Sequence, residues 1–385
     1  MTSAPTSAPA SASTAPADTA PAASETAPAP KKAVRRSRLG ALDALRFLAA
    51  AVVVGYHLTG ISTPYWGVDP REVFPTLNHV TRYGYLGVEL FFIISGFVIL
   101  MTAWGRDLPR FVSSRVARLF PAYWVAVIIT LILQAYWKGG RDQGFVGGLI
   151  NMTMTQDAWD VLSAQGAFWT LWIELKFYLL IGIFLLLGIT KQRVIAVVFL
   201  WPLIAQIARA TDSGVLNSLL FAEYAPFFAM GMALFLIYRF GNSFIAWLAV
   251  AYNVILGIRQ ATDYADRATE LVGATVSPAV TGWAIVAFAA LVWLVSAGPL
   301  GRVEARFLTT LGALTYPLYL IHAQFAFWVI DTFHGRYDEY VVLAAAVSTA
   351  LVLAIALHYL VERRLHDPVR DAVLRGLRET PLQQR

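Results

Sequence analysis

The feature that most constrains this chain is a series of apolar segments of bilayer-spanning length, which begins near residue 40. A transmembrane α-helix needs about 20 predominantly apolar residues to cross a hydrocarbon core about 30 Å thick. Short polar links separate ten segments of this kind, of which the fifth and the seventh are short. They are expected at residues 40–60, 84–104, 116–137, 168–188, 192–208, 217–238, 243–258, 274–297, 307–330 and 341–361. The sequence therefore predicts an all-α, polytopic membrane protein with about ten transmembrane helices.

The composition excludes several other classes of protein. Of the 385 residues, 58% are hydrophobic and only 14% are charged, against about 25% charged residues in an average soluble domain. The chain has no cysteine, which excludes disulfide scaffolds, thiolate nucleophiles, zinc–thiolate sites and iron–sulfur clusters. The net charge of +6 comes from basic residues in short links between apolar segments. Membrane topology explains that distribution, so we expect no nucleic-acid partner.

The N-terminal segment differs sharply from the rest. Ala, Pro, Ser and Thr occupy 27 of the first 30 positions, a composition that cannot form a packed core. We therefore predict that a disordered N-terminal tail, residues 1–38, precedes the membrane domain. Its basic residues lie at its C-terminal end, from Lys31 to Arg38, and not before an apolar stretch near the start, so no cleaved signal peptide is expected. The membrane domain is expected at 39–366, followed by a C-terminal tail at 367–385.

The distribution of basic residues predicts the orientation. With ten spans and the N-terminus inside, the links assigned to the inside hold twenty Lys and Arg residues, and those assigned to the outside hold eight. This asymmetry is the pattern of the positive-inside rule. We therefore predict a multi-pass protein of the inner (plasma) membrane with both termini in the cytoplasm.

Several ionisable side chains lie within the apolar segments, where each one costs about 2.5–3.5 kcal/mol on insertion scales. Such residues are rare unless they are paired or functional. They are Asp43, Arg46, His57, Glu89, Glu174, Lys176 and His322.

Their depth can be predicted from the helical rise of about 1.5 Å per residue. His57 lies roughly 16 Å above Arg46 on an outward-running helix. Glu89 and Glu174 lie roughly 8–9 Å below the outer surface, and His322 lies at nearly the same level. If their four helices are neighbours, these side chains form a polar site suited to acid/base chemistry.

A structural interpretation competes for each of these residues. A single buried histidine commonly forms an interhelical hydrogen bond, Arg46 can pair with Asp43 three residues earlier, and Lys176 can reach the interface. The absent motifs narrow the chemistry further. There is no G-x-S-x-G elbow that would make Ser95 a nucleophile, no phosphate-binding loop and no zinc-ligand spacing. We expect no metal and favour direct general-base catalysis.

A second basic feature precedes the third apolar segment. Arg115 and Arg118 lie on one helical face, followed by Pro121. Guanidinium groups near a helix N-terminus suit the phosphates of a cytoplasmic donor, and ordinary positive-inside anchoring is the alternative. Nearby aromatic residues such as Tyr123 and Trp169 are typical of the membrane interface.

Five motifs in order resemble the acyltransferase-3 family of membrane proteins, which modify bacterial O-antigens and exopolysaccharides, Nod factors, macrolides and similar molecules. The first is Arg46-x10-His57. The others are GYLGVELFFIISGFVI, RVARLFPAYW, FWTLWIELKFYLL and LGALTYPLYLIH, which match the family's segments. Glu362 in HYLVERRL resembles the family's terminal E-x-P, with Arg364 in place of the proline. The resemblance covers residues 40 to about 366.

The resemblance implies that an acyl-coenzyme A donor, with no bound cofactor, transfers its acyl group to a hydroxyl of a carbohydrate or other small acceptor. It implicates the first-segment His57 and Arg46 in catalysis. Our hypothesis adds that Glu89 or Glu174 orients the imidazole and that His322 assists the acceptor or the oxyanion. As substrate contacts we expect Arg115, Arg118, Tyr123, Trp169, Tyr178 and Tyr316.

Two other classes of function compete with this interpretation. Intramembrane carboxylates and histidines also form proton relays, so a proton-coupled transporter or exporter is the main alternative. The two halves of the chain show no obvious repeat, which many transporters have. A non-catalytic scaffold would tolerate the loss of His57 and Glu174 together.

Overall fold

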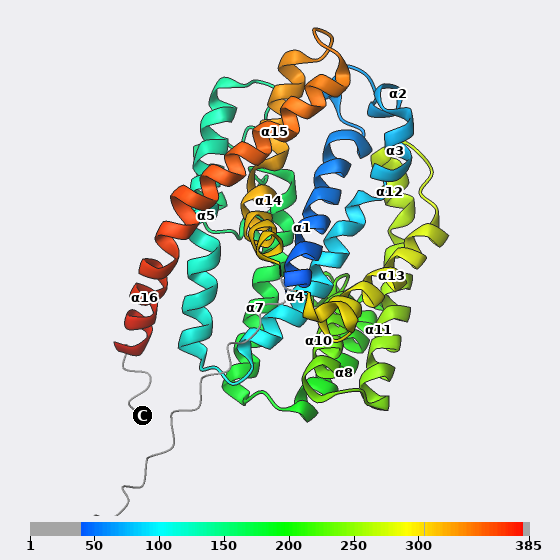
Figure 1. The fold of residues 1–385 in the computed structure, drawn as a ribbon, viewed down its shortest axis with the longest axis vertical. Helices are drawn as coiled ribbons and strands as arrows, with labels where there is room; N and C mark the ends of the chain where they lie inside the picture. The colour runs from blue at the N-terminus through cyan, green and yellow to red at the C-terminus, as the bar shows by residue number, and fades with distance from the viewer. Residues whose placement is uncertain (1–39, 304, 380–385) are drawn as a thin grey trace, which may run out of the picture. The chain divides into compact units, whose positions relative to one another are not determined.

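The computed structural model describes residues 40–303 and 305–379, and all regular secondary structure in these residues is helical (Figure 1). The predicted tail at 1–38 lies outside the described residues. The longer helices are α1 Gly40–Gly55, α4 Gly87–Ala103, α5 Leu108–Tyr136, α7 Trp169–Leu187, α8 Lys191–Ala210, α10 Ala225–Phe240, α11 Phe244–Asp263, α13 Pro278–Ser296, α14 Arg306–Phe333, α15 Glu339–Leu357 and α16 Arg363–Glu379. The shorter ones are α2 Pro70–Val73, α3 Pro75–Thr81, α6 Gly144–Asn151, α9 Gly214–Leu219 and α12 Ala265–Val272.

Nine helical stretches of the described residues are long and apolar enough to cross a membrane. They are Gly40–Gly60, Pro75–Ala103, Leu108–Tyr136, Gly166–Leu187, Lys191–Ala210, Phe244–Val272, Pro278–Ser296, Phe307–Phe333 and Glu339–Glu379. The shorter apolar helix α10 corresponds to the sixth predicted segment and brings the apolar helical stretches of the described residues to ten. This confirms the predicted all-α, polytopic membrane class.

The segment boundaries differ from the prediction in several places, among them the start of the third segment, where α5 begins at Leu108 instead of residue 116. The sixth segment was expected from residue 217, but α10 begins at Ala225 because α9 and a turn precede it. The seventh was expected to end at 258, but α11 continues to Asp263, and Gln260 and Asp263 of this last part line a cavity. The predicted C-terminal tail is helical as far as Glu379. Polar residues there end the apolar segment without ending the helix, because Arg, Glu and Leu are good helix formers.

Close packing of small residues places the central helix. α10 packs against α4, α8 and α11, and most of its side chains are buried. A Cβ on Gly96 of α4 would lie 2.1 Å from the Phe228 carbonyl oxygen, and one on Gly231 would lie 1.9 Å from the Ile93 carbonyl oxygen. Only glycine allows these backbones to approach so closely, as is common between membrane helices.

The four helices with intramembrane polar residues are neighbours. α1 packs against both α4 and α14, and α4 packs against α7. The condition for a shared polar site is therefore met. Helix α5 packs against α7, α14 and α16, which places its arginines beside the same group of helices.

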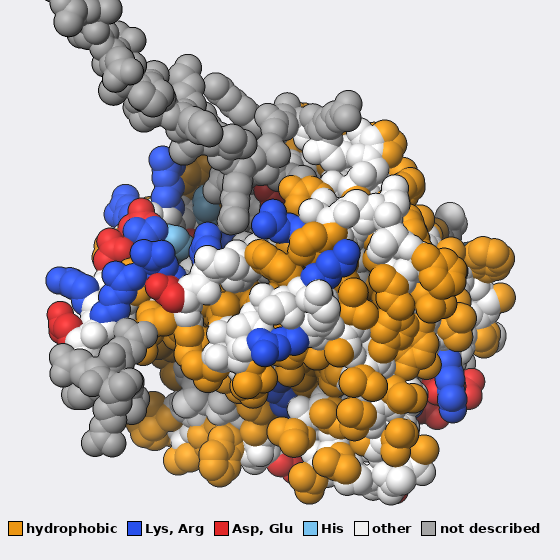
Figure 2. All heavy atoms as spheres, turned by 90° about the horizontal axis from the view of Figure 1, so that it is seen from below, with side chains coloured by type: hydrophobic (Ala, Val, Ile, Leu, Met, Phe, Trp, Pro, Cys, Tyr) orange, Lys and Arg blue, Asp and Glu red, His pale blue; other side chains and the backbone are white. Residues whose placement is uncertain are grey.

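The two ends of the helical bundle differ in the elements they carry. The short helices α2, α3 and α12 lie at the upper end in Figure 1, and the link between α7 and α8 lies at the lower end. Figure 2 views the lower end and shows Lys and Arg side chains spread over it among hydrophobic ones. The sequence assigns the link between α7 and α8 to the cytoplasmic side.

Candidate active site

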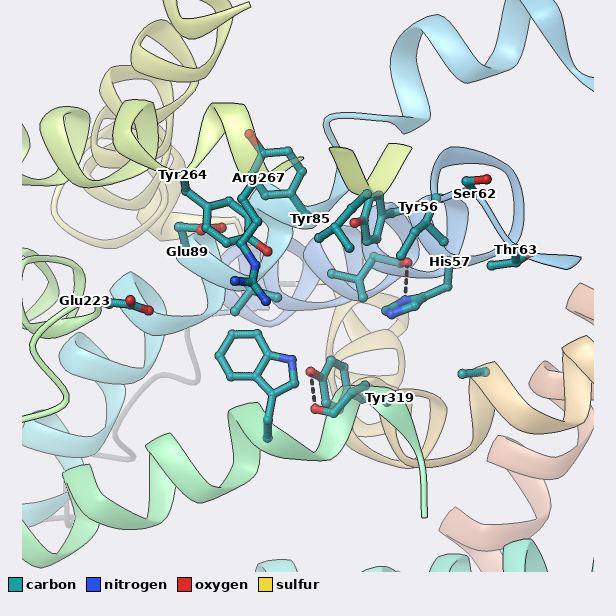
Figure 3. Close-up of a pocket in the computed structure, with 18 of the residues that line it drawn as sticks. Tyr56, His57, Ser62, Thr63, Tyr85, Glu89, Glu223, Tyr264, Arg267 and Tyr319 are labelled. Carbon is teal, nitrogen blue, oxygen red and sulfur yellow. Dashed lines mark hydrogen bonds between the residues drawn. The ribbon is translucent and has the colours of Figure 1, made fainter. Parts of the chain in front are cut away.

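A cavity of about 550 Å³ lies among α1, α4, α7, α10, α11, α12 and α14. A volume of this size is typical of a site for a small organic ligand. Figure 3 shows His57 on one side of it and Glu89, Tyr264 and Arg267 on another, with Glu223 at the far end from His57. Tyr65, which lies in the chain between α1 and α2, also lines this cavity. Burial raises the pKa of its phenol, which therefore stays protonated.

His57 lies in a π-helical turn, Tyr56–Gly60, which directly continues α1. Turns of this kind leave carbonyl groups without their usual helical partners and are frequent at functional sites. Here the carbonyl oxygens receive side-chain hydrogen bonds. The indole of Trp66 donates to Leu58 O at 2.8 Å, and the amide of Asn78 donates to Thr59 O at 2.8 Å and to Gly60 O at 3.2 Å. Trp66, together with Asn78 of α3, therefore fixes the turn that positions His57.

We expect Asn78→Ala to lower activity without removing any group from the cavity. The change leaves two buried carbonyl oxygens without donors, which costs about 1–3 kcal/mol per group, and loosens the turn under His57. The measurement is thermal unfolding in detergent together with the turnover number. A reduced melting temperature with an unchanged turnover number would show that the turn does not position the imidazole.

His57 and His322 contact each other, with their ring centres 5.0 Å apart and the rings tilted by 57°. His57 Nδ1 lies 3.0 Å from Val53 O and 3.2 Å from His322 Nε2. His322 Nδ1 lies 2.9 Å from Tyr319 O. Because a carbonyl oxygen only accepts, we infer that each imidazole, when neutral, carries its proton on Nδ1. The Nε2 atom of His57 is therefore unprotonated, on a ring that lines the cavity (Figure 3).

This arrangement differs from the expected roles of the other acid/base residues. The atoms that face His57 Nδ1 belong to Val53 and His322, whereas we expected a carboxylate there. His322 is fully buried behind His57 and does not line the large cavity. It is thus placed to hold His57, and the expectation that it assists the acceptor or the oxyanion stays a prediction. Glu89 lines the cavity.

Glu174 lies in a second, narrow cavity of about 50 Å³. Its Oε1 receives hydrogen bonds from Ser95 at 3.2 Å and from Tyr178 at 2.9 Å. Arg46 lines the same cavity. Both cavities are lined by Val88 and Tyr319, so they adjoin each other. The helical rise places Glu174 near the level of His57, and in the structure it shares the narrow cavity with Arg46.

The two arginines of α5 face different partners. The guanidinium of Arg115 lies 5.7 Å from the ring centres of both Phe111 and Tyr178. Arg118 forms an ion pair with Glu362 at 3.8 Å. Glu362 is buried and also lies 2.9 Å from the Nδ1 of His358, within a second π-helical turn, His358–Glu362. Glu362 therefore pairs with Arg118 even though Arg364 stands where the family motif has a proline.

The predicted aromatic contacts fall into two groups. Trp169 lines the large cavity and Tyr316 lines the narrow one, while Tyr178 holds Glu174. Tyr123 lines neither cavity. Its buried hydroxyl donates to Asn151 O at 2.7 Å, so the structure gives it a role in holding the loop after α6 and does not place it at a substrate contact.

Sequence reasoning missed the wall formed by α11 and α12. Gln260, Tyr264, Arg267 and Leu271 all line the large cavity. Their spacing of four, three and four residues places them on one face of a helical stretch. A polar stripe at this spacing was therefore present in the sequence, but charged residues near a helix end resemble an ordinary helix terminus.

Bilayer-length helices around an internal cavity with a histidine pair define a multi-pass membrane protein with an acid/base site. The family comparison identifies its class: the model described as "Acyltransferase domain" matches residues 39–360. The chain belongs to this acyltransferase family, which confirms the resemblance seen in its motifs.

The individual relatives share less than a third of the aligned residues with this chain. Peptidoglycan O-acetyltransferase OatA of Listeria monocytogenes is 27% identical over 178 residues, which are 40% of this chain and 26% of that protein. Acyltransferase MdmB of Streptomyces mycarofaciens is 29% identical over 254 residues, which are 56% of this chain and 64% of that protein. The matches thus cover less than two thirds of either relative. No solved structure gives a significant match.

Proposed function

We propose that this protein transfers an acyl group, specifically acetyl, from acyl-coenzyme A to a hydroxyl of a carbohydrate or other small hydroxylated acceptor. The observation that carries the proposal is the unprotonated Nε2 of His57 on the wall of the large cavity. The family membership and the two named acyltransferase relatives support the reaction class.

In the proposed reaction, His57 Nε2 removes the proton from the acceptor hydroxyl while its oxygen attacks the thioester carbonyl. The carbon–sulfur bond then breaks, and the departing sulfur takes the proton from His57 Nε2. The products are an ester and free coenzyme A. His322 keeps the imidazole in the reactive tautomer and shares the Nδ1 proton while His57 is positively charged.

A row of polar groups supports a route for the donor from the α5 arginines. Arg115 lies over Tyr178, and Tyr178 donates to Glu174, which shares the narrow cavity with Arg46. That cavity adjoins the one that His57 lines. The arginines suit the phosphates of the coenzyme. In this proposal, the pantetheine arm extends through the narrow cavity, which widens to admit it, and presents the thioester to His57.

The positive-inside asymmetry supports an inner (plasma) membrane location with both termini in the cytoplasm. In that orientation the α5 arginines meet the cytoplasmic donor. The large cavity then lies toward the outer face, where an acceptor of the cell envelope would enter. Peptidoglycan is the acceptor in the printed name of one relative, and we include its glycan among the acceptors to test.

The test is acetyl transfer from labelled acetyl-coenzyme A by the purified chain in lipid vesicles. Peptidoglycan glycan, soluble oligosaccharides and small hydroxylated compounds serve as acceptors. We expect free coenzyme A to be released only when an acceptor is present, with label recovered as an ester in that acceptor. Solute movement without thioester consumption would overturn the proposal in favour of a transporter.

A further inference from the structure

The α12 wall of the large cavity carries a positive charge that no carboxylate neutralises. Arg267 lines the cavity with an exposed side chain, and Figure 3 shows it pointing into the cavity between Glu223 and His57. No carboxylate of the described residues forms an ion pair with it. Its guanidinium interacts with the hydroxyl of Tyr264, which is a neutral group. The charge of Arg267 is therefore available to a ligand.

The carboxylates that line the cavity are committed elsewhere. Asp263, one turn before Arg267, pairs with Arg209 at 3.8 Å. Glu223 lies at the far end of the cavity (Figure 3), and Glu89 is buried, with an exposure of 8%. Three arginines and three carboxylates line the cavity in all, so the placement of each charge decides what it attracts. At Arg267 the positive charge is uncompensated.

An uncompensated guanidinium in a partly enclosed cavity favours an anionic ligand. The attraction between opposite charges increases as the surroundings become less polarisable than water. The guanidinium also presents its N–H groups in a planar fork that matches two oxygens of a carboxylate or a phosphate. Trp169 and Tyr224, with ring centres 5.4 Å apart, line the same cavity. They offer apolar surface to the body of a small ligand whose anionic group meets Arg267.

The position of Arg267 assigns this anionic group to the acceptor. Helix α12 contributes no lining residue to the narrow cavity, through which the donor is proposed to arrive. The phosphates of the donor are proposed to bind at the arginines of α5, on a different part of the bundle. Arg267 and His57 line one and the same cavity. An anionic group at Arg267 therefore belongs to the ligand whose hydroxyl meets His57.

We propose that Arg267 is a specificity-determining residue that binds an anionic group, a carboxylate or a phosphate, on the acceptor. Neutral acceptors of the same shape bind more weakly. The inference rests on the proposed acyl transfer for the identity of the reaction, but binding of the anionic acceptor does not require turnover.

The experiment measures equilibrium binding of small hydroxylated compounds to the full chain in phosphatidylcholine nanodiscs. Quinate and glucuronate carry a carboxylate and are compared with quinamide and glucuronamide, in which a neutral amide of similar shape replaces it. Glucose 6-phosphate carries a phosphate and is compared with glucose. We expect at least one anion to bind at least tenfold more tightly than its neutral counterpart.

Substitutions of Arg267 test which group provides this preference. Arg267→Gln should weaken binding of the anion about tenfold and leave the neutral counterpart unchanged, because it removes only the charge-assisted hydrogen bonds. Arg267→Lys keeps the charge without the planar fork and should retain part of the preference. The matched control is Arg259→Gln, the same change at an exposed position of α11 that lines none of the three cavities. Its affinities should equal those of the wild type, and thermal unfolding checks that all variants are folded.

The outcomes separate this subsite from the proposed function. No binding of any anion, equal affinities within each pair, or equal effects of Arg267→Gln and Arg259→Gln would overturn the subsite. A matching loss of coenzyme A binding in Arg267→Gln would assign Arg267 to the donor and overturn it as well. Anion binding that depends on Arg267 without any acetyl transfer would keep the subsite and refute the proposed function. Equal rates of acetyl transfer to anionic and neutral acceptors would do the reverse.

Discussion

We expect His57→Gln to lower the turnover number for acyl transfer by about 10³-fold, within the range of about 10²–10⁴ that a positioned general base contributes. Glutamine has a similar reach, but its amide cannot take a proton from the acceptor hydroxyl. The donor should still bind, because the residues of the proposed donor route stay in place. The measurement is coenzyme A release with saturating donor and acceptor, and the Michaelis constants are compared as well.

The control for this prediction is His366→Gln, which changes a partly exposed histidine of α16 that lies beside Asp367. It should keep the wild-type turnover number. A folded, membrane-inserted His57→Gln protein with full activity would exclude the general-base role. A loss of activity accompanied by a large drop in melting temperature would instead assign the histidine pair to stability.

The sequence carried enough information for the helices and for part of the site because both depend on position along a helix. Apolar length predicted where helices cross the bilayer, and the rise per residue predicted that His57 and His322 share a level. The contact between them at 3.2 Å agrees with that reasoning. The same argument placed Glu174 near His57, whereas it faces Ser95 and Tyr178.

Rise along a helix gives the depth of a side chain but not the direction in which it points. That direction depends on how each helix is rotated, which the packing of small residues such as Gly96 and Gly231 decides here. The π-helical turn at His57 adds a local rotation that the hydrophobic pattern does not reveal. The cavity wall formed by α11 and α12 was missed for a related reason. Polar residues near a helix end indicate the membrane interface as readily as a cavity.

We expect Arg115→Gln to raise the Michaelis constant for acetyl-coenzyme A by about 10- to 100-fold. Hydrogen bonds to charged groups contribute about 1.5–3 kcal/mol, and about 1.4 kcal/mol corresponds to a factor of ten. Arg115 suits this role because no carboxylate of the described residues forms an ion pair with it, whereas Arg118 already pairs with Glu362. The turnover number should change little, because the thioester still reaches His57.

The specificity of this effect is tested with acetyl-pantetheine, which has the same thioester but lacks the phosphates of the coenzyme nucleotide. Its Michaelis constant should be the same for wild type and Arg115→Gln. Arg336→Gln removes an exposed arginine from the link between α14 and α15 and should leave both constants unchanged. If Arg115→Gln weakened the two donors equally, Arg115 would act through its packing against Phe111 and Tyr178, and phosphate recognition would have to be sought elsewhere on the α5 face.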